Sequence, residues 1–146
     1  MGRQLEEIMV QARELSQAWR EIVGEVVVSF VDAVNAFDSE RVLLLFAQEA
    51  HVNDQLRDFW GKAAIESWIR REVVGERFSM EVLDARRHFG DLILSAKVSG
   101  DFDKTGLPDP MILSFILSIC DGEIVRLIIL ITRSEEAAPD VRKCGN

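Results

Sequence analysis

The chain has 146 residues, of which 48% are hydrophobic and 29% charged, a composition typical of one globular domain. Its net charge of −8 argues against a nucleic-acid-binding surface, because phosphate contacts need clustered lysine and arginine. No apolar run is long enough to span a membrane, and the first residues lack the basic-then-apolar order of a signal peptide. We therefore expect no nucleic-acid partner, no membrane partner and a cytoplasmic location.

Cysteine and histidine are too sparse for a metal site. Cys120 and Cys144 form no disulfide framework, and His51 and His88 have no metal-ligand spacing. The sequence also lacks a glycine-rich phosphate loop and the motif of a nucleophilic triad. We expect neither a metal nor a cofactor.

The N-terminal segment predicts an amphipathic helix. Its apolar side chains recur at three- and four-residue steps and form one stripe: Leu5, Ile8, Met9, Ala12, Leu15, Trp19, Ile22 and Val23. Gly24 is expected to bend or break this helix. The predicted organisation is a helical extension over residues 1–24, a main domain over residues 25–133 and a polar tail over residues 134–146.

The segment that follows Gly24 carries both strand and helix signals. The valine run at 26–28 favours a strand by propensity. Helical spacing is kept by Phe30, Val31, Val34 and Phe37. We predict a helix here, and then a second short helix over residues 40–46 that Asp38 or Ser39 caps.

The rest of the chain predicts an α+β fold. A short strand, HVND, precedes an amphipathic helix over residues 62–74 that carries Ala64, Ile65, Trp68 and Ile69 on one face. Four strands are expected over residues 78–89, 92–102, 111–120 and 123–132, with turns at Gly90-Asp91 and Asp121-Gly122. This order predicts a sheet of antiparallel strands with helices on one face.

The last two predicted strands are apolar on both faces. Along 111–120, one face carries Met111, Leu113, Phe115, Leu117 and Ile119, and the other carries Ile112, Ser114, Ile116, Ser118 and Cys120. A sheet with one solvated face alternates apolar and polar residues, so the second apolar face needs a cover. We predict a homodimer built on that face, which a charge at Leu117 or Ile119 should split.

Four segments resemble the nuclear transport factor 2-like superfamily, in its SnoaL-like branch. They are FVDAVNAFDSERVLLLFAQEAHVND, GKAAIESWI, AKVSGDF and LSFILSICDGEIVRLIIL, and their order and spacing carry the resemblance. It implies a cone of the cystatin-like type: a curved, mainly antiparallel sheet wrapped around helices, with a pocket at its wide end. Many members are dimers that pack sheet on sheet. The superfamily includes isomerases, cyclases, epoxide hydrolases, dehydratases and non-catalytic binding modules, so fold alone does not fix function.

The resemblance implies a catalytic acid or base at Asp54. This residue ends the short predicted strand, where the isomerases and many cyclase-like members carry that group. A carboxylate in an apolar cup can exchange protons near neutral pH. The residues expected to line the pocket are Phe30, Trp60, Trp68, Ser114 and Ile116, with Trp68 pointing into the cone and Trp60 near its rim. The alternative for Asp54 is a residue that closes a turn.

The chain departs from the isomerase pattern at both oxyanion donors. Phe30 stands where the isomerases carry a tyrosine, and the chain contains no tyrosine. Ser114 stands where they carry a protonated aspartic acid. Because such donors stabilise the enolate, their loss argues against ketosteroid isomerisation. The Asp-Arg-Asp arrangement of the hydrolase branch cannot be placed in the sequence.

Three further polar residues are weighed against the pocket. His51 lies three residues before Asp54, an offset that points the two to opposite faces of a strand, so we expect His51 at the surface or at a partner. Arg57 and Asp58, in the loop after Asp54, could reach a polar substrate, but we expect them to be exposed loop charges. The leading hypothesis is a SnoaL-like small-molecule pocket protein, a lyase, isomerase or cyclase with Asp54 as acid or base. The alternative is a non-catalytic module that binds a ligand or a protein. A buried Asp54 with a second polar group nearby would favour the enzyme.

Overall fold

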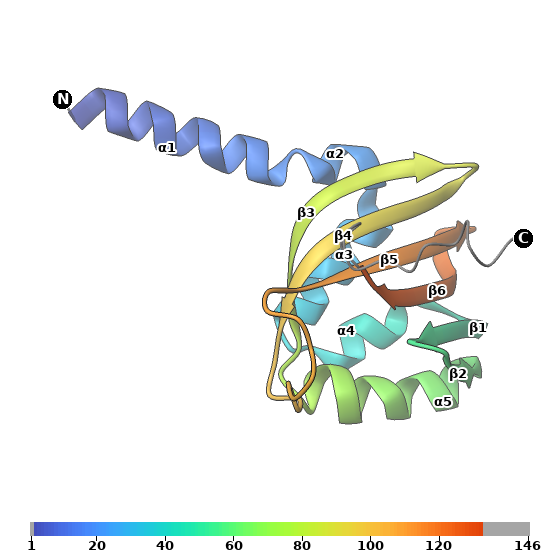
Figure 1. Cartoon of the computed structure of the whole chain (residues 1–146). Coiled ribbons are helices and arrows are strands. Elements are labelled where there is room, and N and C mark those ends of the chain that lie inside the picture. The colour runs from blue at the N-terminus through green and yellow to red at the C-terminus, as the bar shows by residue number, and fades with distance from the viewer. Residues whose placement is uncertain (1, 133–146) are drawn as a thin grey trace, which may run out of the picture.

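The computed structural model describes residues 2–132 (Figure 1). The helices are α1 (Gly2–Gln17), α2 (Trp19–Val23), α3 (Glu25–Asn35), α4 (Ser39–Leu44) and α5 (Gly61–Trp68), which continues as a π-helix, η1 (Ile69–Val74). The strands are β1 (Phe46–Asp54), β2 (Arg57–Trp60), β3 (Ser79–His88), β4 (Asp91–Ser99), β5 (Met111–Cys120) and β6 (Glu123–Ile131). The predicted polar tail, with Cys144, lies outside the described residues.

The strands form one sheet in the order β2-β1-β6-β5-β4-β3. Every neighbouring pair is antiparallel except β1 and β6, which are parallel. The sheet curves around α3 and α4, and α5 closes one side (Figure 1). The predicted α+β cone with a mainly antiparallel sheet is confirmed.

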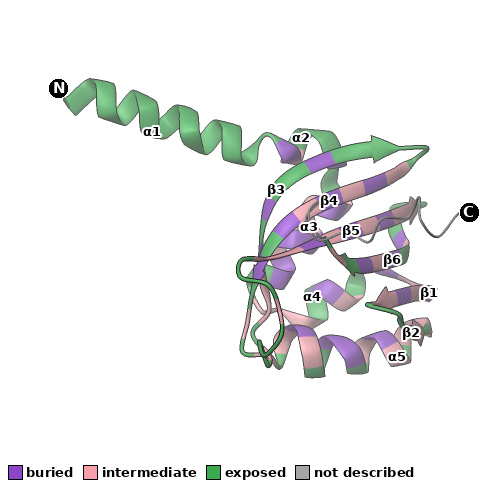
Figure 2. Ribbon diagram, viewed as in Figure 1, coloured by how far each residue is buried: buried purple, intermediate pink, exposed green. Residues whose placement is uncertain are grey.

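The buried residues lie mainly on the strands of the sheet and on the helices that it curves around (Figure 2). Leu113, Phe115 and Leu117 alternate along β5 as fully buried residues, and they belong to the same core cluster as Val27 and Phe30 of α3. Each such side chain contributes about 1.5–3 kcal/mol of transfer free energy when it is buried. This burial explains why α3 is a helix in spite of its valine run, because helical spacing puts its apolar residues on the face that the sheet covers.

The start of α4 is capped as the sequence predicts. The side chain of Asp38 accepts a hydrogen bond from the backbone N–H of Arg41 at 3.1 Å. This bond satisfies one of the free donors of the first helical turn.

A β-hairpin that the sequence did not predict joins β1 to β2. Gln55 and Leu56 form its turn with φ angles of 52° and 72°. Turns of this kind usually carry asparagine or glycine, so their sequence signal is missing here. The hairpin pairs Asp54 with Arg57, which therefore lies on a strand and not in a loop.

The convex face of the sheet differs from the predicted one. Leu117, a predicted dimer contact, is fully buried on the concave side, because the larger side chains of β5 fill the cone. The register puts the following residues on the convex face: Ile93, Ser95, Ile112, Ser114, Ile116, Ser118 and Ile128. These side chains are only partly buried, so an apolar convex face does exist, but it is the opposite side of the strand.

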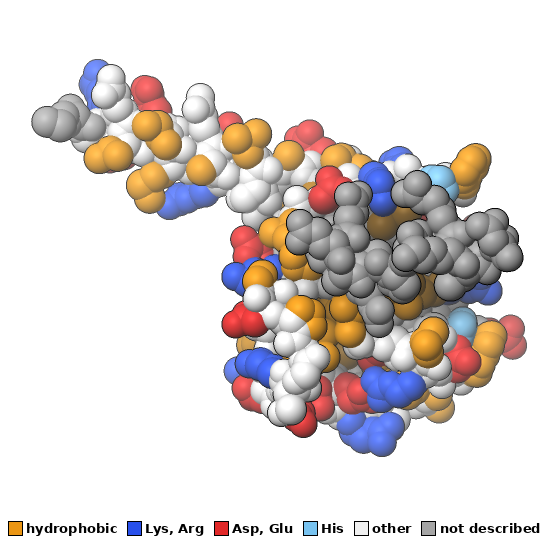
Figure 3. Space-filling model, in the orientation of Figure 1, with side chains coloured by type: hydrophobic (Ala, Val, Ile, Leu, Met, Phe, Trp, Pro, Cys, Tyr) orange, Lys and Arg blue, Asp and Glu red, His pale blue; other side chains and the backbone are white. Residues whose placement is uncertain are grey.

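Helix α1 projects away from the body of the cone (Figure 1). None of its described residues is buried, and the part of the apolar stripe on α1 is exposed, with Leu15 78% exposed (Figure 3). The last residues of the stripe, Trp19 and Val23 on α2, are buried in the core. Gly24, at a φ of 83°, ends α2 and turns the chain into α3, as predicted. None of the described helices combines the length and the apolar character needed to cross a membrane.

Candidate functional site

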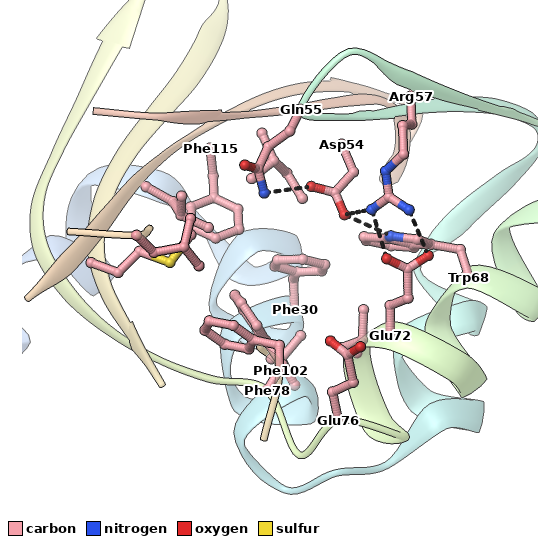
Figure 4. Close-up of a pocket in the computed structure, with 16 residues that line it drawn as sticks. Phe30, Asp54, Gln55, Arg57, Trp68, Glu72, Glu76, Phe78, Phe102 and Phe115 are labelled. Carbon is pink, nitrogen blue, oxygen red and sulfur yellow. Dashed lines mark hydrogen bonds and ion pairs between the residues drawn. The ribbon is translucent and has the colours of Figure 1, made fainter. Parts of the chain in front are cut away.

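A cavity of about 250 Å³ opens between the sheet, α3, the α5–η1 helix and the loop that follows β4 (Figure 4). Its polar lining residues are Asp54, Gln55, Arg57, Glu72 and Glu76. Its apolar lining residues are Phe30, Val34, Trp68, Val73, Phe78, Phe102, Leu107, Met111, Leu113, Phe115 and Ile129. The cavity is thus an aromatic chamber with one charged wall.

Asp54 is held on that wall by two donors. Its side chain is 13% exposed, and its Oδ2 accepts hydrogen bonds from the Trp68 indole Nε1 and from Arg57 Nη2, each at 3.0 Å. The other oxygen, Oδ1, has only a long contact of 3.4 Å with Gln55 Nε2. The two donors at Oδ2 fix the orientation of the carboxyl group, while Oδ1 is left available to a bound molecule.

Arg57 bridges two carboxylates. Besides Asp54, it binds Glu72 through two hydrogen bonds of 2.6 and 3.1 Å (Figure 4). The hydrogen bond with Glu72 is the largest cause that raises the pKa of the Arg57 guanidinium. The result is an acid–arginine–acid arrangement, Asp54–Arg57–Glu72, that sequence reasoning failed to place.

The helical spacing between Trp68 and Glu72 could have indicated that Glu72 lines the cavity. Trp68 and Glu72 are four residues apart, and such residues share one face of a helix. Since Trp68 was expected to face the cone, Glu72 should have been expected beside it. The sequence did not indicate that Arg57 pairs with these carboxylates, because that pairing depends on the unpredicted β1–β2 hairpin.

Glu76 is a second residue that sequence reasoning missed. Burial is the main cause that raises the pKa of its carboxyl group, the charge of Glu72 adds to the shift, and Arg57 opposes it. Among the described residues, none donates a hydrogen bond to this carboxyl group, whereas its backbone oxygen accepts from Asp101 N at 2.7 Å. Its position just beyond the end of a helix carries no periodicity that could reveal it.

We predict that Glu76→Gln makes the free energy of unfolding less dependent on pH. A carboxyl group whose pKa is raised by folding binds its proton more tightly in the folded state. Its contribution to stability is complete below the ordinary pKa of 4.5 and is lost as the pH rises through the folded value. The variant should therefore gain stability relative to wild type as the pH rises above the ordinary pKa of 4.5.

Urea unfolding at several pH values measures this difference. Glu81→Gln, at an exposed position of β3, is the matched control and should follow the wild-type profile. If the free energy of unfolding changes with pH in the same way for Glu76→Gln and wild type, the prediction is wrong.

The structure brings together three of the predicted site residues. Phe30, Asp54 and Trp68 all line the cavity. The predictions for Trp60, Ser114 and Ile116 were wrong. Trp60 pairs with His51 across the hairpin, on the convex face, and is 66% exposed.

Ser114 and Ile116 were assigned to the wrong side of β5. The strand alternates, and its buried positions are Leu113 and Phe115, so Ser114 and Ile116 point outward. The Ser114 hydroxyl shares a hydrogen bond of 2.8 Å with the hydroxyl of Thr132 and donates nothing to the cavity.

His51 lies on the convex face, as the strand geometry predicts. Its ring stacks on Trp60 with centroids 3.9 Å apart, and its Nε2 is 2.7 Å from Asp58 Oδ1. Asn53 also donates a hydrogen bond to Asp58. The hydrogen bond from Asn53, followed by that with His51, is the main cause that lowers the pKa of the Asp58 carboxyl group. His51 and Asp58 are therefore separate from the cavity.

Gly100 permits the wall formed by Phe102. A Cβ atom at this position would lie 2.9 Å from two atoms of the Phe102 ring and 3.0 Å from the Glu76 backbone oxygen. We predict that Gly100→Ala displaces the ring and costs about 1–3 kcal/mol of stability, the range for overpacking. Denaturant unfolding checks this, with Ser99→Ala, at an exposed neighbour, as the control. Equal stability of Gly100→Ala and wild type would refute it.

Comparison with known proteins identifies the fold. No protein-family model matches the sequence, and no curated protein is significantly similar to it. A candidate polyketide cyclase from Sinorhizobium meliloti is 28% identical, with a TM-score of 0.66 over 74% of this chain and 95% of that one.

Two further solved structures share the fold at lower identity. A protein of ketosteroid isomerase-like fold from Catenulispora acidiphila, in complex with trimethylamine, is 18% identical, with a TM-score of 0.62 over 74% of this chain and 85% of that one. The Orange Carotenoid Protein of Anabaena, binding canthaxanthin, is 20% identical, with a TM-score of 0.61 over 79% of this chain and 38% of that one.

Fold and cavity together define a small cone-shaped α+β protein with an internal cavity. The chain has the nuclear transport factor 2-like fold that its sequence predicted, and it shares this fold with these solved structures. Its similarity to the candidate cyclase agrees with a SnoaL-like protein of unassigned activity.

Proposed function

We propose that the chain binds a small, largely apolar molecule in this cavity and moves a proton on it with Asp54, in a lyase, isomerase or cyclase reaction. The observation that carries the proposal is the position of Asp54. It is shielded from solvent and held by Arg57 and Trp68, and Glu76 lines the same cavity. A mobile carboxylate that closes a surface turn would not need two such donors.

The free oxygen of Asp54 gives a simple proton path. Oδ1 accepts a proton from a carbon next to a carbonyl group of the substrate, and the electron pair of the broken C–H bond moves toward the carbonyl oxygen. The same carboxyl group then returns the proton to another carbon in an isomerase. In a lyase the enolate electrons form a new double bond and expel a leaving group, which takes this proton from the carboxyl group. The aromatic walls exclude water from this step.

A ligand screen followed by an exchange measurement tests the proposal. Small apolar carbonyl compounds that raise the melting temperature bind the folded chain, because a ligand stabilises by mass action. For those compounds, NMR in deuterated water should show enzyme-dependent exchange of the hydrogen next to the carbonyl group. Binding without any exchange would contradict proton transfer.

A non-catalytic binding module remains the second candidate. Its support is the missing oxyanion donors, since Phe30 carries no hydroxyl group and Ser114 points away from the cavity. In that function Asp54 and Arg57 serve only to orient a ligand. The exchange measurement separates the two functions, because a module binds without moving protons.

We also propose that two copies of the chain pack through the convex face of the sheet. Its apolar residues Ile93, Ile116 and Ile128 are only partly buried and lie on adjacent strands. Ile116→Glu should therefore yield a monomer at micromolar concentration in sedimentation velocity, because it buries a charge in the contact. Leu44→Glu, at a 71% exposed position of α4, is the control and should leave the dimer intact. A monomeric wild type would disprove the proposal.

The remaining expectations from the sequence stay predictions. They are the cytoplasmic location, the lack of a nucleic-acid partner, and the division into an extension over 1–24 and a domain over 25–133. The exposed apolar stripe of α1 supports treating that helix as separate from the domain.

A further inference from the structure

The charged wall of the cavity has more acidic than basic groups. Its ionisable residues are three carboxylates, Asp54, Glu72 and Glu76, and one guanidinium, Arg57. Arg57 is fully engaged by Asp54 and Glu72. When all four groups are ionised, the wall has an excess of two negative charges, and Glu76 forms no ion pair with any of the described residues.

The rest of the cavity offers aromatic rings. Phe30, Trp68, Phe78, Phe102 and Phe115 all line it. The Phe78 ring centroid lies 6.5 Å from that of Phe102 and 6.4 Å from that of Phe115, so these three form a continuous surface. Phe102 and Glu76 belong to neighbouring segments, because Asp101 N donates to the Glu76 backbone oxygen (Figure 4).

Negative charge and aromatic faces attract the same kind of ligand. A cation over an aromatic ring is stabilised by the negative face of the ring, and more strongly where water is excluded. An ammonium group that carries methyl groups suits such a site, because it needs few hydrogen-bond acceptors and buries apolar surface as well. A primary ammonium would lose strong hydration that the cavity cannot replace.

We infer that the cavity takes a small organic cation, an alkylated ammonium compound whose charged nitrogen lies between the Glu76 carboxylate and the faces of Phe78 and Phe102. This inference rests on the proposed function and names the class of its substrate. The remainder of the molecule extends toward Phe115 and Ile129, near Asp54 Oδ1. Burial raises the pKa of the Glu76 carboxyl group and the charge of Glu72 adds to the shift, so a bound cation would favour its ionised form.

An isosteric pair of probes tests the charge directly. Choline and 3,3-dimethyl-1-butanol have nearly the same shape, but only choline is charged. Calorimetric titration of the full chain at neutral pH should give an affinity for choline at least about tenfold higher than for the neutral alcohol. Glu76→Gln should reduce the choline affinity about tenfold and leave that of the alcohol unchanged.

Two more variants separate the aromatic contribution from general effects on folding. Phe102→Leu should weaken choline binding while the alcohol binds as before, which also shows that the cavity is intact. Glu123→Gln, at an exposed position of β6, removes a charge elsewhere and should change neither affinity.

The outcomes distinguish the two proposals. If the alcohol binds as tightly as choline or more tightly, the cation inference is wrong, whereas ligand binding by the cavity stands. If neither probe binds at millimolar concentration, the cation inference is also wrong. Failure of the proposed proton transfer is measured separately, by the exchange assay with carbonyl compounds.

Discussion

Asp54→Asn should lower the rate of proton transfer by about 10²–10⁴, the usual contribution of a general acid or base. Asparagine has nearly the shape of aspartate but cannot take up a proton at neutral pH. Its amide oxygen can still accept hydrogen bonds from Arg57 and Trp68, so the wall keeps its geometry. Solvent deuterium exchange on a carbonyl ligand, with ligand affinity measured in parallel, checks the effect.

The matched control is Asp58→Asn on the convex face. Asp58 lies in the same hairpin and also accepts two hydrogen bonds, but it is not part of the cavity. Its variant should exchange protons at the wild-type rate. Equal rates for Asp54→Asn and wild type would rule out Asp54 as the base and leave the binding module as the function.

The sequence predicted the fold because most of its long segments keep a clear helical or strand periodicity. Helical spacing identified α3, although the valines at its start favour a strand, and burial against the sheet decided in favour of the helix. Alternation and the Asp121-Gly122 turn identified β5 and β6. These patterns report which faces are buried, and burial determines the architecture.

The same patterns failed where both faces of a strand are apolar. On β5, Ile116 and Leu117 are equally hydrophobic, so alternation shows that two faces exist but not which one is concave. A one-residue choice moves every side chain to the opposite face. That single choice misplaced Ser114 and Ile116 in the cavity, and Leu117 in the dimer contact.

The charged wall could not be predicted because its members meet only in three dimensions. Arg57 comes from a hairpin with a turn that lacks the usual residues, Glu72 from the π-helix, and Glu76 from the turn beyond it. In the sequence, each of these three residues is indistinguishable from an ordinary solvent-exposed charge. Asp54 was an exception, because a resemblance to known proteins pointed to its position.

Trp68→Ala is expected to destabilise the chain by about 3–5 kcal/mol, the range for removing a large buried aromatic side chain. The Trp68 side chain is 2% exposed and packs against Phe59, with ring centroids 6.0 Å apart. It also lines the cavity and donates to Asp54, so the variant should change ligand affinity as well. Denaturant unfolding and a ligand titration on the same variant measure both effects.

Trp68→Phe separates packing from hydrogen bonding. Phenylalanine keeps an aromatic ring but removes the indole N–H, so stability should fall by about 1–3 kcal/mol, the cost of leaving a charged acceptor with one donor fewer. Trp60→Ala is the matched control, because that ring is 66% exposed on the convex face, and its loss should cost less than about 1 kcal/mol. If Trp68→Ala were as mild as Trp60→Ala, the indole could be neither a packed wall of the cone nor the support of Asp54.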